Sequence, residues 1–261
     1  MIRITFWSWY CIGALLLIFF SVPAGLQFSN GLFLVFYALY AGELLLQSAR
    51  RAHMTGQSVP GSLPQKRSYF FWSAAMIWLG GMAVEWFGVH TGHLFGSYEY
   101  SDILGPLLLS VPVTLGFAWI AVICNAVLLS RDFGQTGWRL KLLRALQVGF
   151  WTVLLDLVLD PVAHARGFWS WEGGGWFYQV PLSNFAGWLI AGSILSLFLP
   201  AVSLTKLTVR RGTRLYQGVL ILFGLVALRE GLPLCMVIAC AGIVLSEGSL
   251  RYAQSRQIQK L

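Results

Sequence analysis

The chain has 261 residues, of which 57% are hydrophobic and 11% are charged, and its mean hydropathy is +0.70. A soluble domain carries about 45–50% apolar and about 25% charged residues, so this composition excludes an ordinary soluble fold. The net charge of +8 would suggest a nucleic-acid partner if the basic residues formed one patch. They lie instead in short loops between apolar runs, so we expect no nucleic-acid partner and one integral membrane domain over residues 1–261.

Apolar runs follow one another along the whole chain, and crossing a bilayer takes about 20 such residues per helix. This predicts an all-α, polytopic transmembrane helix bundle of about eight spans. The first run lacks a convincing small-residue cleavage site and continues into a second span, so we expect it to be retained. The predicted spans are 6–25, 31–49, 70–89, 105–130, 145–162, 183–204, 215–229 and 232–248.

The last two runs are separated only by a short polar segment that contains Arg229, Glu230, Gly231 and Pro233. One long kinked helix is the alternative to two separate helices. A charged pair followed by Gly and Pro stops a helix and is costly at the centre of a membrane. We therefore predict a tight hairpin at this point.

The basic residues alternate with the predicted spans. Sixteen of the eighteen Lys and Arg residues fall on one side of the eight-span arrangement, and the positive-inside rule makes that side cytoplasmic. We therefore predict a multi-pass protein of the cell membrane with both termini in the cytoplasm. Only Arg166 and Arg229 fall on the other side, and the sixteen are Arg3, Arg50, Arg51, Lys66, Arg67, Arg131, Arg139, Lys141, Arg144, Lys206, Arg210, Arg211, Arg214, Arg251, Arg256 and Lys260.

The acidic and histidine residues of the central part of the chain gather on the opposite side from the basic loops. Glu85 lies about one turn inside the apolar zone of the third span, where an unpaired charge costs at least about 2.5–3.5 kcal/mol. It must therefore be protonated, paired or facing a hydrated cavity; a purely structural helix-end carboxylate is the plainer alternative. The other members of this polar group are His90, His93, Glu99, Asp102, Asp156, Asp160, His164 and Glu172.

Asp156 and Asp160 are four residues apart on the fifth span and so share one helix face. Two like charges this close are not both comfortable in low dielectric, so one is expected to keep its proton at neutral pH, as a general acid must. Pro161 should end or kink the helix and direct His164 over the mouth of the bundle. The alternative is a structural pair capped by Arg166 or by loop amides.

The loop that follows is dense in aromatic residues interleaved with glycines. Such residues either form an interfacial belt, as in any membrane protein, or fold as a lid over an apolar substrate. Asn184 should lie at the depth of Asp160, in a structural or a catalysis-supporting role. The aromatic residues are Phe168, Trp169, Trp171, Trp176, Phe177 and Tyr178.

A zinc site is a further possibility, because His90 and His93 together with His164 and Asp160 could form a tetrahedral shell. The Thr91-Gly92 pair between the first two histidines argues against the helical spacing that such ligands need. We expect no metal and no organic cofactor. The rival functions are a metal-dependent intramembrane lipid hydrolase and a non-catalytic binding or transport protein, although one-sided polar clustering without a repeat counts against a transporter.

Two segments carry a resemblance to a known family. Residues 84–105, with the TGHLFGSYEY core, and residues 154–188, with DLVLDP, GFWSW and VPLSNFAGW, resemble the carotenoid biosynthesis hydratases of the bisanhydrobacterioruberin and gamma-carotene 1,2-hydratase type. The resemblance implies hydration of the terminal 1,2 double bond of an acyclic carotenoid to a tertiary alcohol, without an organic cofactor. It also implies the cytoplasmic membrane of a prokaryote, with carotenoid, water and membrane lipid as partners, and other pathway enzymes as candidate partners.

This chemistry assigns hypothetical roles to the polar group. Protonation of the alkene gives a tertiary carbocation that aromatic faces and a carboxylate stabilise. We expect Asp156 or Glu85 to donate the proton, and Asp160 with His164 or His93 to position water and remove its proton. Trp169, Trp171 and Tyr98 would line the cation pocket. The expected substrate-binding residues are His90, Tyr98, Tyr100, Trp169, Trp171 and Asn184.

Overall fold

The computed structural model describes residues 1–20, 22–54, 67–130, 137–200 and 202–258. These residues form eight α-helices and a few short strands, which confirms the all-α bundle. The helices are α1 (Ile2–Phe19), α2 (Phe28–Met54), α3 (Arg67–Thr91), α4 (Val113–Leu129), α5 (Trp138–Ala165), α6 (Leu182–Ser196), α7 (Lys206–Arg229) and α8 (Pro233–Ile258). The strands are β1 (Tyr98–Tyr100), β2 (Leu107–Leu108), β3 (Val111–Pro112) and β4 (Trp169–Trp171), and the 3₁₀ turns are η1 (Ala24–Leu26) and η2 (Asp102–Leu104).

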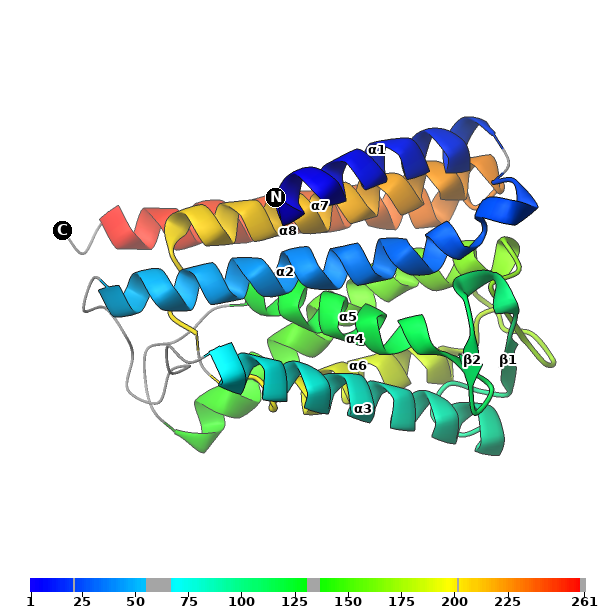
Figure 1. Ribbon diagram of the computed structural model, residues 1–261, viewed down its shortest axis with the longest axis horizontal. Helices are drawn as coiled ribbons and strands as arrows, with labels where there is room; N and C mark the ends of the chain where they lie inside the picture. Colours follow the sequence, from blue (N-terminus) through cyan, green and yellow to red (C-terminus); the bar gives the residue numbers. More distant parts are fainter. Residues whose placement is uncertain (21, 55–66, 131–136, 201, 259–261) are drawn as a thin grey trace.

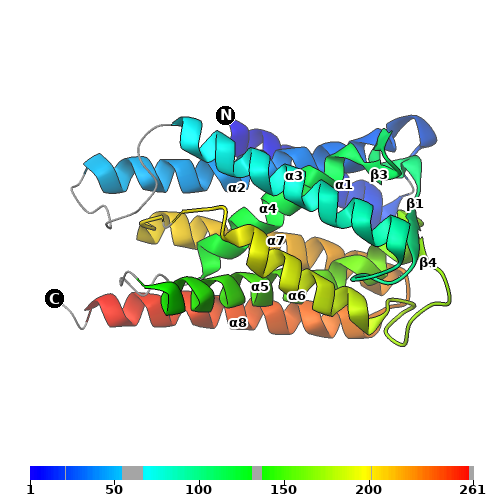
Figure 2. The same cartoon turned by 90° about the horizontal axis from the view of Figure 1, so that it is seen from below.

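The helices run along the long axis of the molecule, and the strands lie together at one end of it (Figure 1, Figure 2). α2 packs mainly on α4, α5 on α6, and α7 on α8, while α1 contacts α2 and α7 at the edge. α1 runs toward the end that carries the strands, and α8 runs away from it. The strands therefore close one mouth of the bundle.

α4 is the central helix, and nearly all of its residues are buried. Its sequence is apolar on every side, as expected for a helix surrounded by others. Its one amide, Asn125, is satisfied on both atoms: Oδ1 accepts from the Tyr37 hydroxyl at 2.8 Å, and Nδ2 donates to the Gly212 carbonyl at 2.9 Å. These bonds tie α4 to α2 and α7, because a buried polar group left unpaired would be destabilising.

Five helices among the described residues are long and apolar enough to cross a membrane: α1, α2, α3, α5 and α8. α4 and α6 are apolar but shorter, with 17 and 15 residues. The molecule is thus a helical membrane protein. The number of spans and the cytoplasmic location of the termini stay predictions.

The predicted span 105–130 is wrong at its start, because residues 107–112 form the β2–β3 hairpin and α4 begins only at Val113. Leu109 and Ser110 at its tip have φ of 50° and 67°, which are the positive values of a two-residue hairpin turn. The predicted span 183–204 also ends too late, since α6 ends at Ser196. The predicted span 215–229 begins too late, because α7 begins at Lys206. Thr205 is its N-cap, and its side-chain oxygen accepts a hydrogen bond from the Thr208 amide at 3.2 Å.

The tight hairpin near the C-terminus is confirmed. α7 ends at Arg229 and α8 begins at Pro233, and the two helices pack side by side in opposite directions (Figure 1). Gly231 between them has φ of +75°, a left-handed conformation that glycine adopts at helix C-termini without steric cost. One kinked helix is therefore excluded.

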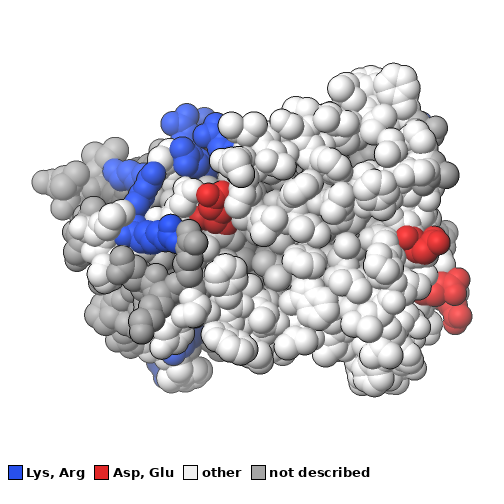
Figure 3. All heavy atoms as spheres, viewed as in Figure 1, with Lys and Arg blue, Asp and Glu red and all other residues white. Residues whose placement is uncertain are grey.

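The charges of the visible face separate toward the two ends of the molecule (Figure 3). Lys and Arg side chains gather at the end where α8 finishes, with some acidic surface beside them, and the remaining acidic surface lies at the end that carries the strands. This is the separation that the loop charges predict. Lys66, Arg131 and Lys260 of that prediction lie outside the described residues.

Candidate functional site

Glu85 lies on α3 and is only 2% exposed. Its carboxylate accepts three hydrogen bonds: Oε2 from the hydroxyls of Tyr98 at 2.6 Å and Tyr100 at 2.7 Å, and Oε1 from the indole N–H of Trp119 at 2.9 Å. Three donors compensate a buried negative charge, which alone would be very costly. The structure thus gives Glu85 partners rather than a free path to water at a helix end.

The two tyrosines reach Glu85 because β1 pairs with β4 at the mouth of the bundle. Side chains alternate along a strand, so Tyr98 and Tyr100 point to the same face, with Glu99 exposed between them. The antiparallel register sets Tyr98 opposite Trp171 and Tyr100 opposite Trp169. Two segments about seventy residues apart in sequence thereby build one aromatic wall.

Burial raises the pKa of Tyr98, and the nearby Glu85 carboxylate raises it further. The pKa of Tyr100 is raised well above its usual value for the same two reasons, burial first. An ordinary tyrosine loses its proton near pH 10. Both hydroxyls therefore stay protonated, and stay hydrogen-bond donors to Glu85, at a pH where exposed tyrosines ionise.

Asp156 and Asp160 lie one turn apart on α5 and are 1% and 2% exposed. Asn184, near the start of α6, donates from Nδ2 to Oδ2 of Asp156 at 3.0 Å and to Oδ2 of Asp160. Oδ1 of Asp156 and Oδ1 of Asp160 are buried and have no hydrogen-bond partner among the described residues. Two carboxylates bridged by one amide in a buried site repel each other unless one of them is protonated, so this arrangement favours a proton on the pair.

Pro161 does not end α5, which continues to Ala165. The alternative in which Arg166 caps the aspartates does not match the contacts, because Arg166 Nη1 bonds Glu230 Oε1 at 2.9 Å. The pair is held by Asn184 instead.

A small pocket joins the two groups of carboxyls. It has about 240 Å³ of empty space, and Glu85, Asp160 and Asn184 all face it. Asp156 does not line it. The remaining lining is mostly aromatic: Phe95, Tyr98, Tyr100, Leu115, Trp169, Trp171 and Trp188. We call this space the site pocket.

The aromatic loop divides into two parts. Trp169 and Trp171 are each 8% exposed and line the site pocket, and the indole of Trp171 donates to the Phe95 carbonyl at 2.9 Å. Trp176 is 74% exposed, as expected for a residue of an interfacial belt. The loop thus has buried residues at the site pocket and an exposed one, and its roles as a lid and as an interfacial belt stay predictions.

The three histidines of the prediction do not join the pocket lining. His164, at the end of α5, packs its ring against Trp171 at 5.7 Å between centroids, and its buried Nδ1 has no partner among the described residues. His90 and His93 are exposed at the end of α3, and their Nδ1 atoms contact the backbone carbonyls of Trp86 and Thr91 at 2.9 Å. Within the described residues, no group of three or more His, Cys, Asp or Glu side chains is arranged to hold a metal ion.

Trp119 and Trp188 belong to the site but were not among the predicted residues. Their rings stack at 4.3 Å between centroids with an interplanar angle of 20°. Trp119 binds Glu85, and Trp188 lines the pocket. One signal was available for Trp119: an indole N–H in the middle of an apolar helix needs a buried acceptor.

Comparisons with known proteins match the part of the chain that contains the site. The family model described as "Carotenoid biosynthesis protein" matches residues 63–246, which include both groups of carboxyls. The bisanhydrobacterioruberin hydratase of Haloarcula japonica is 41% identical to this chain over 115 residues. That match covers 42% of this chain and 38% of the relative, so the chain spans well under two thirds of the relative's length. No solved structure matches.

Proposed function

The chain belongs to the family of carotenoid biosynthesis proteins, and on that premise we propose that it adds water to the terminal 1,2 double bond of an acyclic carotenoid. The product is a tertiary alcohol. The observation that carries the proposal is the site pocket, in which Asp160, bridged to Asp156 by Asn184, and the hydrogen-bonded Glu85 face one aromatic-lined space. The name of the partly matching relative supports hydration as the reaction.

The proton comes from the Asp156–Asp160 pair. Asp160 faces the pocket, so it delivers the proton to C2, the less substituted carbon of the double bond, while Asp156, which shares the Asn184 amide with it, completes the pair. The electron pair of the double bond forms the new C–H bond, and the positive charge stays on the more substituted carbon. Asn184 holds both carboxyls in place for this step.

The cation is stabilised by the walls of the pocket. Indole and phenol rings offer negative faces to a cation, and Trp169, Trp171 and Tyr98 surround the space in which it forms. Glu85 adds a carboxylate whose position is fixed by three donors before the reaction begins. Such preorganised charge is the strongest contribution that a site makes to an ionic transition state.

Water completes the reaction. Its oxygen bonds to the tertiary carbon, and the resulting oxonium loses one proton to the aspartate pair, which is then ready for the next turnover. One alkene and one water give one alcohol, and no oxidant or reductant is needed. His164 acts as a positioning residue in this scheme, since it contacts Trp171 and not the pocket itself.

The test is pigment analysis by chromatography and mass spectrometry in cells that make lycopene or another acyclic carotenoid. Cells with the wild-type chain should accumulate a pigment heavier by one water. Asp160→Asn should abolish that product, whereas Asp102→Asn, which changes an exposed acid at the same end of the molecule, should keep it.

Absence of any hydrated pigment from well-expressed wild type across several acyclic substrates would overturn the proposal. Metal content and lipid hydrolysis of the purified protein would then be measured, because the lipid hydrolase is the remaining enzymatic alternative.

A further inference from the structure

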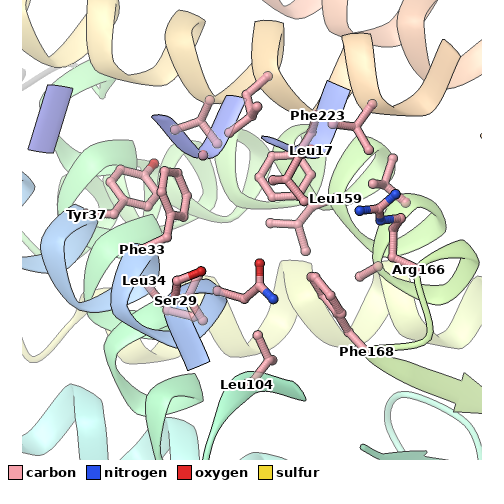
Figure 4. Close-up of a pocket in the computed structure, with 18 of the residues that line it drawn as sticks. Leu17, Ser29, Phe33, Leu34, Tyr37, Leu104, Leu159, Arg166, Phe168 and Phe223 are labelled. Carbon is pink, nitrogen blue, oxygen red and sulfur yellow. The ribbon is translucent and has the colours of Figure 1, made fainter. Parts of the chain in front are cut away.

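A second and much larger pocket lies beside the site pocket. It is enclosed by α1, α2, α4, α5 and α7, with an empty volume of about 1130 Å³, part of which is open to the surface. Figure 4 shows its walls, with Tyr37 and Phe33 toward one end and Arg166 and Phe168 toward the other. The lining is apolar almost throughout, and no residue of the proposed hydration chemistry other than Trp169 contributes to it.

The two pockets share a wall. Leu115, Trp169 and Trp188 line both of them. These side chains come from α4, β4 and α6, and they separate the two spaces. A molecule with one end at Asp160 reaches the larger space by passing between these side chains.

We propose that the larger pocket, hereafter the chain pocket, binds the hydrocarbon chain of the substrate, an acyclic polyene, while its terminal double bond lies in the site pocket. The inference rests on the proposed function. The site pocket, with about 240 Å³ of empty space, is too small for a long polyene. The substrate comes from lipid, which is as apolar as the chain pocket, so the chain pocket selects by shape and van der Waals packing and not by removal from water.

The composition of the pocket favours a polyene over a phospholipid. A phospholipid needs a partner for its anionic head group, and among the described residues that line the chain pocket Arg166 is the one cation. Its guanidinium is already paired with Glu230 at 2.9 Å, in a neighbouring polar hollow that Gln27 and Asn30 also line. Aromatic side chains such as Phe33, Phe168 and Phe223 offer flat faces along the pocket instead.

α1 offers a position at which the pocket can be filled from one wall. Gly13 lines the chain pocket, and a Cβ built there meets no atom within 4 Å. Gly13→Phe should therefore fold and occupy pocket volume. Gly248→Phe is the matched control, because Gly248 is also a helical glycine with open space around it but lies on α8, outside the chain pocket.

The first experiment measures kcat/KM of the full chain in membranes with a long acyclic carotenoid and with a short acyclic isoprenoid that has the same end group. Gly13→Phe should lower kcat/KM for the long substrate about tenfold or more, a loss of about 1.4 kcal/mol. It should change the value for the short substrate less than about twofold. Gly248→Phe should leave both unchanged.

The second experiment separates this inference from the proposed reaction. Asp160→Asn protein, purified from cells that make lycopene, should retain pigment whether or not the wild type hydrates it, and adding Gly13→Phe should reduce the retained pigment several-fold. Thermal unfolding in detergent checks folding. If Gly13→Phe does not fold, Phe223→Trp fills the pocket from α7.

Unchanged pigment retention and unchanged kcat/KM for the long substrate in a folded pocket-filling variant would overturn the inference. Phospholipid in place of pigment, identified by mass spectrometry of the molecules bound to the Asp160→Asn protein, would also overturn it. A wild type that retains pigment in the chain pocket without hydrating it would overturn the proposed function alone.

Discussion

The site pocket and the chain pocket lie on opposite sides of one wall and differ in almost every property. The first is small and is faced by carboxyl and amide groups, most of which hydrogen-bond to named partners. The second is several times larger and nearly free of polar groups. The site pocket draws on α3, α4, α5 and α6 with β1 and β4, whereas α1 and α2 line only the chain pocket. Because the two pockets differ in their linings, separate substitutions should alter the hydration reaction and the selection of substrates by length.

The largest expected effect is on the site pocket alone. Asp160→Asn removes the proton that faces the alkene, and general acid catalysis contributes about 10²–10⁴-fold, so we expect a loss of about 10³-fold or more in hydration rate. Pigment retained in the chain pocket should not change. Initial rates of alcohol formation and the pigment-to-protein ratio measure the two effects. Loss of retained pigment together with loss of rate would show that the two pockets are not independent.

Glu85→Gln should lower the rate about 10²-fold. The substitution keeps the shape of the side chain but removes the negative charge opposite the cation, and losses of about 10²–10³-fold are typical when one preorganised electrostatic group is removed. KM for the long substrate should stay within about twofold, because the chain pocket is untouched. Glu99→Gln, at the exposed position of β1 between the two tyrosines, is the matched control. A rate equal to wild type would remove Glu85 from the mechanism.

Tyr98→Phe and Tyr100→Phe should each lower the rate by about tenfold or less, since each removes one of three donors to Glu85. The double variant should lose more than either single one, because the carboxylate then keeps only Trp119. Tyr69→Phe, at an exposed position on α3, should have no effect. Alcohol formation in membranes measures all four. Full activity of the double variant would contradict the role given to these hydroxyls.

The smallest expected effect concerns the edge of the chain pocket. Arg166 and Glu230 form a half-buried ion pair between the ends of α5 and α7. Such a pair is worth about 1 kcal/mol or less in a double-mutant cycle. Thermal unfolding of Arg166→Met, Glu230→Met and the double variant should yield a coupling free energy of that size. The kcat of all three variants should be unchanged. A coupling near zero would show that the pair does not hold the two helix ends together.

Much of the architecture could be predicted because hydrophobic length and loop charge are local properties of the sequence. The short segment at Gly231 predicted the hairpin between α7 and α8 correctly for the same reason. The start of α4 could not be predicted in this way. Leu107, Leu108 and Val111 are as apolar as a membrane helix, but the positive φ values at Leu109 and Ser110 turn them into a hairpin.

The candidate site was predictable where it depends on spacing along one helix, as with Asp156 and Asp160. Asn184 was predictable from its depth relative to Asp160, and Tyr98, Trp169 and Trp171 were assigned with the family resemblance. Trp119 and Trp188 were missed because their role depends on how α3, α4 and α6 pack against one another. The exposed positions of His90 and His93 could not be predicted for the same reason. Residue type alone does not determine toward which side a ring at the end of a helix points.

One contact described by the structure bears on the order in which the chain is made. Arg229, the last residue of α7, donates from its guanidinium to the carbonyls of Leu17 and Phe20 at the end of α1. Tyr10 of α1 likewise donates to the Gly218 carbonyl of α7 at 2.8 Å. During synthesis, α1 is therefore made about two hundred residues before the side chain that caps it. The chain pocket acquires its last wall only when α7 arrives, so a ribosome-bound chain that ends before α7 has no closed place for a polyene.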